Sequence, residues 1–385
     1  MPKPKPIFST IFFLILALLL PLQIHSATFS GDIAALRAFK LSVSPSSIPP
    51  ASCLATWNFS KSDPCAVPRV TDFICAVSCS AGRVVQLTLD SQRYAGILTP
   101  SISNLTQLIY LDLGDNNFHG QIPSSISSLP NLKKLILRVN TLTGSVPPSI
   151  ANLRSLETLD LSGNSLSGAL PDMSKLVNLK RLDLSNNKLT GSVPRLPPNL
   201  NELALRNNSL SGTLTRSVFS GLTRLMVVEL GENSIAGVLE SWFLQLPSLQ
   251  QVDLAKNGLT GVSVEKCPAS ELVSVNLSHN NIQGSLPVNF SEYPLLRSLA
   301  LSHNRFSGPI PQQYSKKGSL LQRLFLDGNF LNGIPPVRFF SGEWSVSGSL
   351  GDNCLQLCPK KSDLCSTSQK NASICQQAYG GKSKY

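Results

Sequence analysis

Leucines and other large apolar residues recur along most of the chain in one short pattern, in which they alternate with polar residues. The stretch LDLSGNSLSGALP, residues 159–171, shows this pattern in full. Its L-x-L alternation predicts a short strand with one buried face. Asn164 interrupts the leucines, and its amide groups resist burial without hydrogen-bond partners. We therefore expect this asparagine to have a fixed structural role.

The same pattern occurs eleven times. The position of Asn164 recurs at intervals of 21 to 25 residues, mostly 24, at Gln92, Asn116, Asn140, Asn164, Asn187, Asn208, Asn233, Asn257, Asn280, Asn304 and Asn329. A single unit cannot bury its leucines, so stacked copies must share a continuous core. We expect each asparagine to lie at the bend after its strand and to hydrogen-bond the backbone of its own and neighbouring turns, as a ladder.

The extended motif L-x-x-L-x-L-x-x-N-x-L-x-G-x-I/L-P resembles the plant extracellular leucine-rich repeat of receptor kinases, receptor-like proteins and polygalacturonase-inhibiting proteins. The resemblance covers residues 83–335 and reaches an N-terminal cap, residues 27–82, through ALRAFKLSV and the Asp-Pro-Cys at 63–65. It implies an α/β repeat fold: a right-handed solenoid of about eleven repeats with a concave parallel β-sheet and disulfide-stapled caps. Residues 336–385 would form the C-terminal cap and a polar tail.

Three segments depart from this pattern. The repeat before Asn208 is shortened, and the repeat after Asn257 loses its proline in GVSVEKCPAS, so we expect uneven curvature there. The cap segment CAVPRVTDFICAVSC lacks the family's tryptophan and glycine and carries an extra cysteine, which leaves the pairing in the cap open.

Eight of the nine cysteines lie in two groups at the ends of the chain: Cys53, Cys65, Cys75, Cys79, Cys354, Cys358, Cys365 and Cys375. In an exported protein such groups predict disulfides. A zinc site is the alternative because C-x3-C occurs twice, but no histidine lies near either group. We expect no metal and no cofactor. Cys267 stands alone, and we expect it to be a buried free thiol.

Residues 1–26 are typical of a secretory signal peptide, with a basic start, an apolar run from Ile11 to Leu20 and small residues before Ala27. An uncleaved anchor is the alternative, but the apolar run is short for a spanning helix. No later segment approaches 18 consecutive apolar residues. We therefore expect a protein without a membrane span, secreted to the extracellular space or cell wall, or held at the plasma membrane surface.

The chain is basic, with a formal net charge of +11, which falls to +9 when the two lysines of the signal are removed. This charge favours polyanions such as acidic polysaccharide or anionic lipid, and export makes nucleic acid the least plausible of them. Six N-x-S/T sequons are candidate glycosylation sites: Asn58, Asn104, Asn207, Asn276, Asn289 and Asn371.

No catalytic signature is found in the sequence. The three histidines outside the signal, His119, His279 and His303, are paired with no nucleophile by any motif, so we expect exposed side chains and no enzyme. We expect binding on the concave face, where residues outside the leucine pattern face solvent.

The column between the two strand leucines reads Thr88, Asp112, Ile136, Asp160, Asp183, Ala204, Glu229, Asp253, Asn276, Ala300 and Phe325. Basic residues flank its first half, and the candidate binding residues are Lys133, Lys134, Arg138, Asp160, Lys180, Arg181, Asp183 and Arg206. Such a mixed field suits a polar or acidic partner. The alternative is a solvated face of neutralising pairs, such as Glu157 between two lysines. A glycan at Asn276 would obstruct the later repeats and move the ligand toward repeats two to six.

These observations predict a secreted, non-catalytic recognition protein of the plant cell wall space. It would bind a protein or peptide partner on its concave face in defence or signalling, as a monomer or a co-receptor subunit. Two alternatives are an inhibitor of a wall-degrading enzyme and a structural protein held by charge on acidic pectin. Salt separates the last from the others, because polyanion binding weakens as ionic strength rises.

Overall fold

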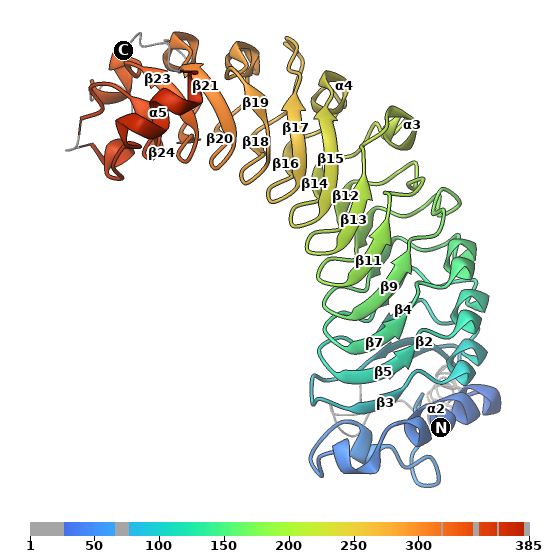
Figure 1. The fold of residues 1–385 in the computed structure, drawn as a ribbon. Coiled ribbons are helices and arrows are strands. Elements are labelled where there is room, and N and C mark those ends of the chain that lie inside the picture. The colour runs from blue at the N-terminus through green and yellow to red at the C-terminus, as the bar shows by residue number, and fades with distance from the viewer. Residues whose placement is uncertain (1–26, 66–76, 317–318, 342–345, 360–361, 381–385) are drawn as a thin grey trace, which may run out of the picture.

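The chain forms a curved solenoid with one long sheet along its inner side (Figure 1). The computed structural model describes residues 27–65, 77–316, 319–341, 346–359 and 362–380. The long sheet has thirteen strands, of which only the first pair is antiparallel. The strands are β1 (Val77–Ser80), β2 (Arg83–Thr88), β4 (Tyr110–Asp112), β6 (Lys134–Ile136), β8 (Thr158–Asp160), β10 (Arg181–Asp183), β12 (Glu202–Ala204), β14 (Val227–Glu229), β16 (Gln251–Asp253), β18 (Ser274–Asn276), β20 (Ser298–Ala300), β22 (Arg323–Phe325) and β24 (Ser347–Ser349).

A second layer of strands follows the bend of each coil. Eight strands form one parallel sheet: β3 (Ala95–Ile97), β5 (Asn117–Gln121), β7 (Thr141–Gly144), β9 (Ser165–Ala169), β11 (Lys188–Gly191), β13 (Ser209–Gly212), β15 (Ser234–Leu239) and β17 (Gly258–Val262). Four more form another: β19 (Gln283–Gly284), β21 (Arg305–Pro309), β23 (Phe330–Gly333) and β25 (Cys354–Leu355). The interruption between β17 and β19 falls at the coil whose proline is missing.

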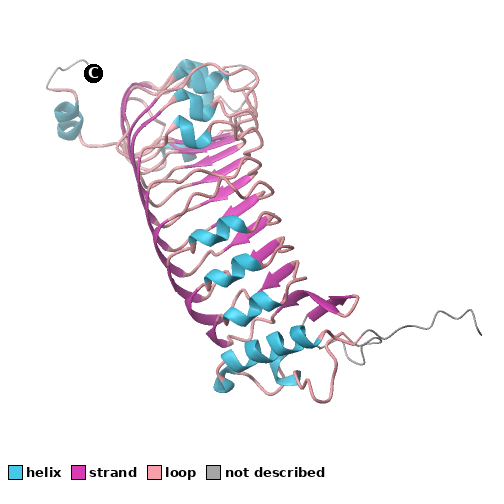
Figure 2. Cartoon of the chain, turned by 90° about the vertical axis from the view of Figure 1, so that its right-hand side faces the viewer, coloured by secondary structure: helices cyan, strands magenta, loops and turns pink. Residues whose placement is uncertain are grey.

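Short helices lie on the outer side of the solenoid, where Figure 2 shows them facing the viewer. They are η3 (Pro100–Asn104), η4 (Ser124–Ser128), η5 (Pro148–Asn152), α3 (Arg216–Phe219), α4 (Ser241–Leu244), η6 (Val288–Glu292), η7 (Gln312–Ser315) and η8 (Val337–Phe340). Among the described residues, each coil whose asparagines are 24 or 25 residues apart has such a helix, and the coils of 21 or 23 residues have none. Coil length therefore decides whether the outer side is helical.

The predicted asparagine ladder is present and joins the two layers. The side-chain amide of Asn164 donates to the carbonyl oxygens of Leu137 and Leu161, both at 3.0 Å. Its carbonyl oxygen accepts from the backbone N–H of Leu142, also at 3.0 Å. The leucines on either side are buried in one core that runs along the solenoid. The asparagine satisfies backbone groups that neither sheet reaches, which explains why it can lie among leucines.

The ladder differs from the prediction at both ends. Gln92 is exposed, so the buried ladder begins at Asn116. At the other end the ladder continues to Asn353, which donates to Leu326 at 3.0 Å. This further coil, with strand β24, lies in the segment that the sequence assigned to the C-terminal cap.

The N-terminal cap is fastened to the sheet by a buried ion pair. It contains α2 (Ser30–Ser42), η1 (Pro45–Ser47) and η2 (Leu54–Thr56). Asp32 on α2 is fully buried and contacts the Arg83 guanidinium at 3.0 Å, while its other oxygen accepts from the Val84 N–H at 2.8 Å. This contact raises the pKa of Arg83.

The predicted cysteine groups form disulfides in both caps. The pairs are Cys65–Cys79, Cys354–Cys375 and Cys358–Cys365, the last two beside η9 (Asp363–Cys365) and α5 (Ala372–Ala378). Cys53 is also disulfide-bonded, and Cys75 lies outside the described residues. Cys267 is free but only half-buried, where the sequence predicted burial.

The predicted signal peptide, residues 1–26, lies outside the described part of the chain. Within that part, no helix combines the length and the apolar character that a membrane crossing needs. No group of three or more His, Cys, Asp or Glu side chains there is arranged to hold a metal ion.

Candidate binding face

The concave sheet presents its outward side chains in straight columns because its parallel strands, from β2 to β24, pair without a register shift. The predicted column is confirmed: Asp112 pairs with Ile136, which pairs with Asp160, and the register continues through Asp183 to Phe325. Neighbouring strands lie about 4.8 Å apart. Charged side chains on adjacent strands are therefore close enough to interact.

The basic residues of the first repeats are already paired within the protein. Glu157 contacts the Lys133 ammonium at 3.3 Å and the Lys180 ammonium at 2.8 Å. Hydrogen bonds from Lys180 and then Lys133 lower the pKa of Glu157. This is the neutralising arrangement that the sequence left open as an alternative. Lys134 differs, since its ammonium lies 4.8 Å from the centre of the Tyr110 ring.

Two further candidates of the first repeats have internal partners. Arg138 contacts Asp115 at 3.0 Å. Asp160 is only 7% exposed, and its carboxylate accepts hydrogen bonds from the N–H and hydroxyl of Ser162 at 3.1 and 2.6 Å. Asp160 therefore lies in the concave column, but little of its side chain is exposed to a partner.

Ion pairs also connect the coils in the middle of the sheet. Arg181 contacts Glu202 at 2.7 Å and Asp183 at 3.6 Å. Arg206 contacts Glu232 at 2.6 Å and Asp253 at 3.2 Å. A third cation joins this set through Lys256, whose ammonium lies 3.1 Å from Glu232. The middle of the concave face is thus a continuous field of fixed charges.

One acid stands out in this field. Glu229 is exposed at the end of β14, and among the described residues no basic side chain lies within ion-pair distance of it. Desolvation at the concave surface, followed by repulsion from Asp253 and Asp183, raises the pKa of Glu229. The weaker attraction of Arg206 and Arg181 opposes this shift. The sequence placed Glu229 in the column but did not single it out, because pairing across coils is a property of the folded surface.

The later coils present a different chemistry. Phe325 is 37% exposed in the concave column. The rings of His279 and His303 stack with centroids 4.3 Å apart, and both residues adopt a left-handed backbone conformation at the turn before the ladder. His303 lies 3.4 Å from Asp327. Asn276 is half-buried between Asp253 and Ala300 in the same column.

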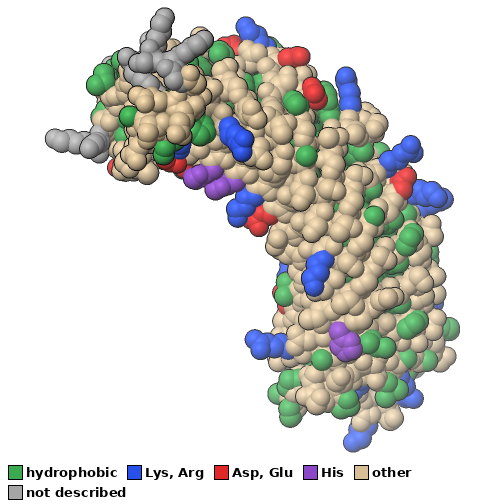
Figure 3. Space-filling view, in the orientation of Figure 1, with side chains coloured by type: hydrophobic (Ala, Val, Ile, Leu, Met, Phe, Trp, Pro, Cys, Tyr) green, Lys and Arg blue, Asp and Glu red, His purple; other side chains and the backbone are tan. Residues whose placement is uncertain are grey.

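The side of the solenoid formed by the second layer of strands is poor in charge. Figure 3 shows this side with few charged side chains over its middle strands. Its exposed positions there are small and polar, for example Thr143, Ser167, Thr190 and Ser211. The concave sheet therefore carries more ionised side chains than this side of the solenoid.

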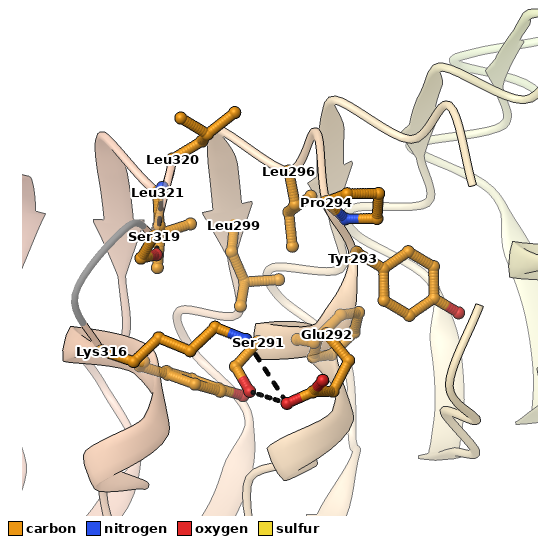
Figure 4. Close-up of a pocket in the computed structure, with 12 residues that line it drawn as sticks. Ser291, Glu292, Tyr293, Pro294, Leu296, Leu299, Lys316, Ser319, Leu320 and Leu321 are labelled. Atoms are coloured by element: carbon orange, nitrogen blue, oxygen red, sulfur yellow. Dashed lines mark hydrogen bonds and ion pairs between the residues drawn. The ribbon is translucent and has the colours of Figure 1, made fainter. Parts of the chain in front are cut away.

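A cavity of about 270 Å³ lies under helices η6 and η7, away from the concave column (Figure 4). Leu296, Leu299 and Leu321 line it together with a polar group of three residues. In that group the Glu292 carboxylate lies 3.4 Å from both the Lys316 ammonium and the Ser291 hydroxyl. Its charges compensate each other, so it shows no preference for a charged ligand.

Comparison with known proteins supports the fold and the class. The leucine rich repeat profile matches residues 107–166 and 198–259, and a related profile of the same repeat matches 178–200, 271–292 and 295–316. The leucine rich repeat N-terminal domain profile matches residues 29–71. This chain is a leucine-rich repeat protein. Its repeats are similar to those of Receptor-like protein 7 of Arabidopsis thaliana, with 38% identity over 92 residues, which is 23% of this chain and 9% of that protein.

Solved plant structures are similar over most of the chain. A structure entitled PEPR1-AtPEP1 is 27% identical, with a TM-score of 0.75, and covers 85% of this chain and 46% of that one. The plant peptide hormone receptor RGFR1 in complex with RGF2 is 28% identical, with a TM-score of 0.59, over 71% and 48%. A plant ice-binding protein, 24% identical with a TM-score of 0.63 over 90% and 99%, shares the fold alone. The chain thus spans less than half the length of both receptor chains.

Proposed function

We propose that this chain is a secreted, non-catalytic recognition protein that binds a peptide along its concave face, with a basic residue of the peptide opposite Glu229. The observation that carries the proposal is Glu229 itself, an exposed acid without an ion-pair partner in a field where the surrounding charges are paired. Burial, followed by repulsion from Asp253 and Asp183, disfavours the charged form of Glu229, and a ligand cation beside it would offset both effects.

The similar receptor ectodomains support a peptide as the ligand class. Two of the solved structures are, by their titles, a peptide hormone receptor with RGF2 and PEPR1 with AtPEP1. The predicted signal peptide and the disulfides of both caps support secretion. A role in plant defence or signalling in the cell wall space is part of this proposal.

Of the predicted binding residues, Arg181, Asp183 and Arg206 surround Glu229 in the proposed footprint. The footprint covers the coils of β10 to β16. Lys180 precedes β10 at the edge of this footprint, and Lys133, Lys134 and Arg138 belong to an earlier coil and would contact only a longer peptide. A glycan at Asn276 would border the footprint on β18. Intact-mass mapping of the secreted protein shows whether Asn276 carries a glycan. If Asn276 is unmodified, no glycan limits the footprint at β18.

The test is a binding screen of the secreted chain against synthetic peptides in which basic, neutral and acidic residues are exchanged one position at a time. We expect the wild-type chain to prefer peptides with a basic residue at one position. The Glu229→Gln variant should lose this preference. Glu240→Gln is the matched control, because Glu240 is an exposed acid at the start of α4 on the outer side. Equal binding by wild type and Glu229→Gln would contradict the proposal.

Salt separates this function from charge-held binding to acidic pectin. A packed peptide interface should persist at high ionic strength, whereas attraction between the basic chain and a polyanion should not. Recovery of pectin alone at low salt, with no peptide selected, would favour the structural alternative.

A further inference from the structure

The concave column changes its chemistry at Phe325 on β22. Phe325 is 37% exposed, whereas its neighbours in the column are the small residues Ala300 on β20 and Ser349 on β24. Among the described residues, Phe325 takes part in no ring stacking and no cation–π contact. The ring therefore extends beyond the side chains on both sides and offers apolar surface to a ligand.

A basic ligand residue does not suit this end of the column. Arg323 lies two positions before Phe325 on the same face of β22, and its side chain is exposed. No carboxylate among the described residues lies within ion-pair distance of its guanidinium. The Phe325 end therefore favours an apolar side chain, whereas Glu229 on β14 favours a cation. The two ends of this stretch select different ligand chemistry.

Between the two ends the column is formed by short side chains. Asp253 on β16 is held by Arg206 at 3.2 Å, and Asn276 and Ala300 follow it on β18 and β20. All three residues of the column are half-buried. The backbone of an extended ligand can therefore approach the sheet closely over these three strands.

Asn276, at the centre of this stretch, has one polar atom that the described residues leave without a partner. Its side-chain carbonyl accepts from the Ser278 N–H at 3.1 Å, but its amide nitrogen donates to no described residue. The ladder asparagines differ, since the amide nitrogen of Asn280 donates to the Leu254 carbonyl at 2.9 Å. The Asn276 amide is therefore available to a backbone carbonyl of an extended ligand. The same nitrogen would carry the glycan of this sequon, so a glycan and this contact exclude each other.

We propose that the peptide footprint extends from Glu229 to Phe325 across an unglycosylated Asn276, and that the ligand carries an apolar residue about six positions from its basic residue. This inference rests on the proposed function and adds a second specificity contact to it. The strands β14, β16, β18, β20 and β22 are consecutive in the sheet, so four spacings of about 4.8 Å separate Glu229 from Phe325, about 19 Å in all. An extended peptide rises about 3.3 Å per residue and covers this distance in about six residues. Its apolar side chain packs on the Phe325 ring, and its backbone accepts from Asn276.

The test uses synthetic glycine–serine peptides that contain one lysine and one phenylalanine, whose separation is varied one position at a time. We expect the full chain to bind most tightly at a separation of about six. Phe325→Ala should weaken binding of the best peptide about tenfold. It should not weaken binding of the same peptide with alanine in place of phenylalanine, because only the aromatic side chain uses the ring. Val337→Ala is the matched control, since Val337 is 75% exposed on η8 at the outer side of the solenoid, and it should leave both affinities unchanged.

The Asn276 contact is tested with the same two peptides. Asn276→Ala should weaken both by the same factor, about fivefold, because the lost hydrogen bond is to the ligand backbone. Ser278→Ala is the control: it removes the sequon but keeps the Asn276 amide, so it should leave binding unchanged. Tighter binding by Ser278→Ala, together with a glycan mass on Asn276 of the wild type, would overturn the proposal.

The outcomes separate this inference from the function on which it rests. A preference for lysine that Glu229→Gln abolishes, with no preference for phenylalanine at any separation, overturns the second contact and leaves the peptide function standing. A preference for phenylalanine that Phe325→Ala does not change also overturns the second contact. Wild-type binding that does not depend on lysine contradicts the proposed function itself, and a chain that binds none of the peptides contradicts both.

Discussion

The asparagine ladder and the concave ion pairs are two polar systems built from the same coils, and they differ in burial. Asn304 is 5% exposed and makes its hydrogen bonds to backbone in both layers of strands. Glu157, on the concave face, pairs with two lysines that are each more than half exposed. A buried polar group that loses its partner is costly, whereas an exposed pair contributes little. The ladder therefore serves stability, and the ion pairs are free to serve recognition.

The largest expected effect is at the ladder. Asn304→Ala should lower the free energy of unfolding by about 3 kcal/mol, because it strands the carbonyls of Leu277 and Leu301 and the N–H of Ile282. Chemical denaturation measures this. Asn117→Ala is the control, since Asn117 is an exposed strand asparagine, and its effect should stay within about 0.5 kcal/mol. An equal loss of unfolding free energy in Asn304→Ala and Asn117→Ala would contradict a special role of the ladder in stability.

A smaller effect is expected at the concave ion pairs. Glu157→Gln should cost about 0.5 kcal/mol at neutral pH and low salt, because exposed pairs are screened by water. The pKa of Glu157 is lowered in the folded chain, so this contribution exists above its unfolded pKa near 4.5 and is lost as pH falls through the folded value. Denaturation of the wild type and of Glu157→Gln at several pH values checks the direction of this pH dependence. A loss of unfolding free energy as large as that of Asn304→Ala would contradict a small contribution from the exposed pairs.

The unpaired acid should behave in the opposite sense. The pKa of Glu229 is raised in the folded chain, so the folded state loses stability as pH rises through 4.5 to that value. Glu229→Gln should then raise the melting temperature slightly at pH 7 while it weakens binding of a basic peptide. A thermal melt beside the binding screen measures both, and a lower melting temperature would mean that Glu229 has a structural partner.

The smallest expected effect on stability is at the stacked histidines, where NMR can follow single side chains. Burial, followed by the positive charges of His303 and Lys256, lowers the pKa of His279 below 6.5. His303→Gln removes one of these causes and should move the titration of His279 upward, which NMR of the imidazole signals measures. The unfolded chain binds a proton at higher pH than the folded one here, so stability falls slightly as pH drops through 6.5. An unchanged titration would show that the two rings do not interact in solution.

Much of the fold was predictable because the same sequence pattern, and with it the same coil, is repeated along the chain. The strand leucines, the bend asparagines and the two cysteine groups were found from spacing alone. The coil of Asn353 was missed because Gly348 occupies the position that pairs with Leu324, which removes the L-x-L signal. Gln92 has the spacing of a ladder residue, but its side chain is exposed and lies outside the buried ladder.

The candidate site was predictable only as a surface. The sequence by itself determined which positions face outward from the concave sheet, since alternation decides that for each strand. Only the tertiary structure decided which of their charges are available: Asp160 is enclosed, Glu157 is shared by two lysines, and Glu229 has no cation. The reason is that, apart from Arg181 with Asp183, the ion pairs of this face join residues 21 to 47 positions apart, in coils brought together by stacking. The repeat spacing predicts that the coils stack. Which charges are paired depends on which side chains of neighbouring coils come within contact distance, and the spacing does not show this.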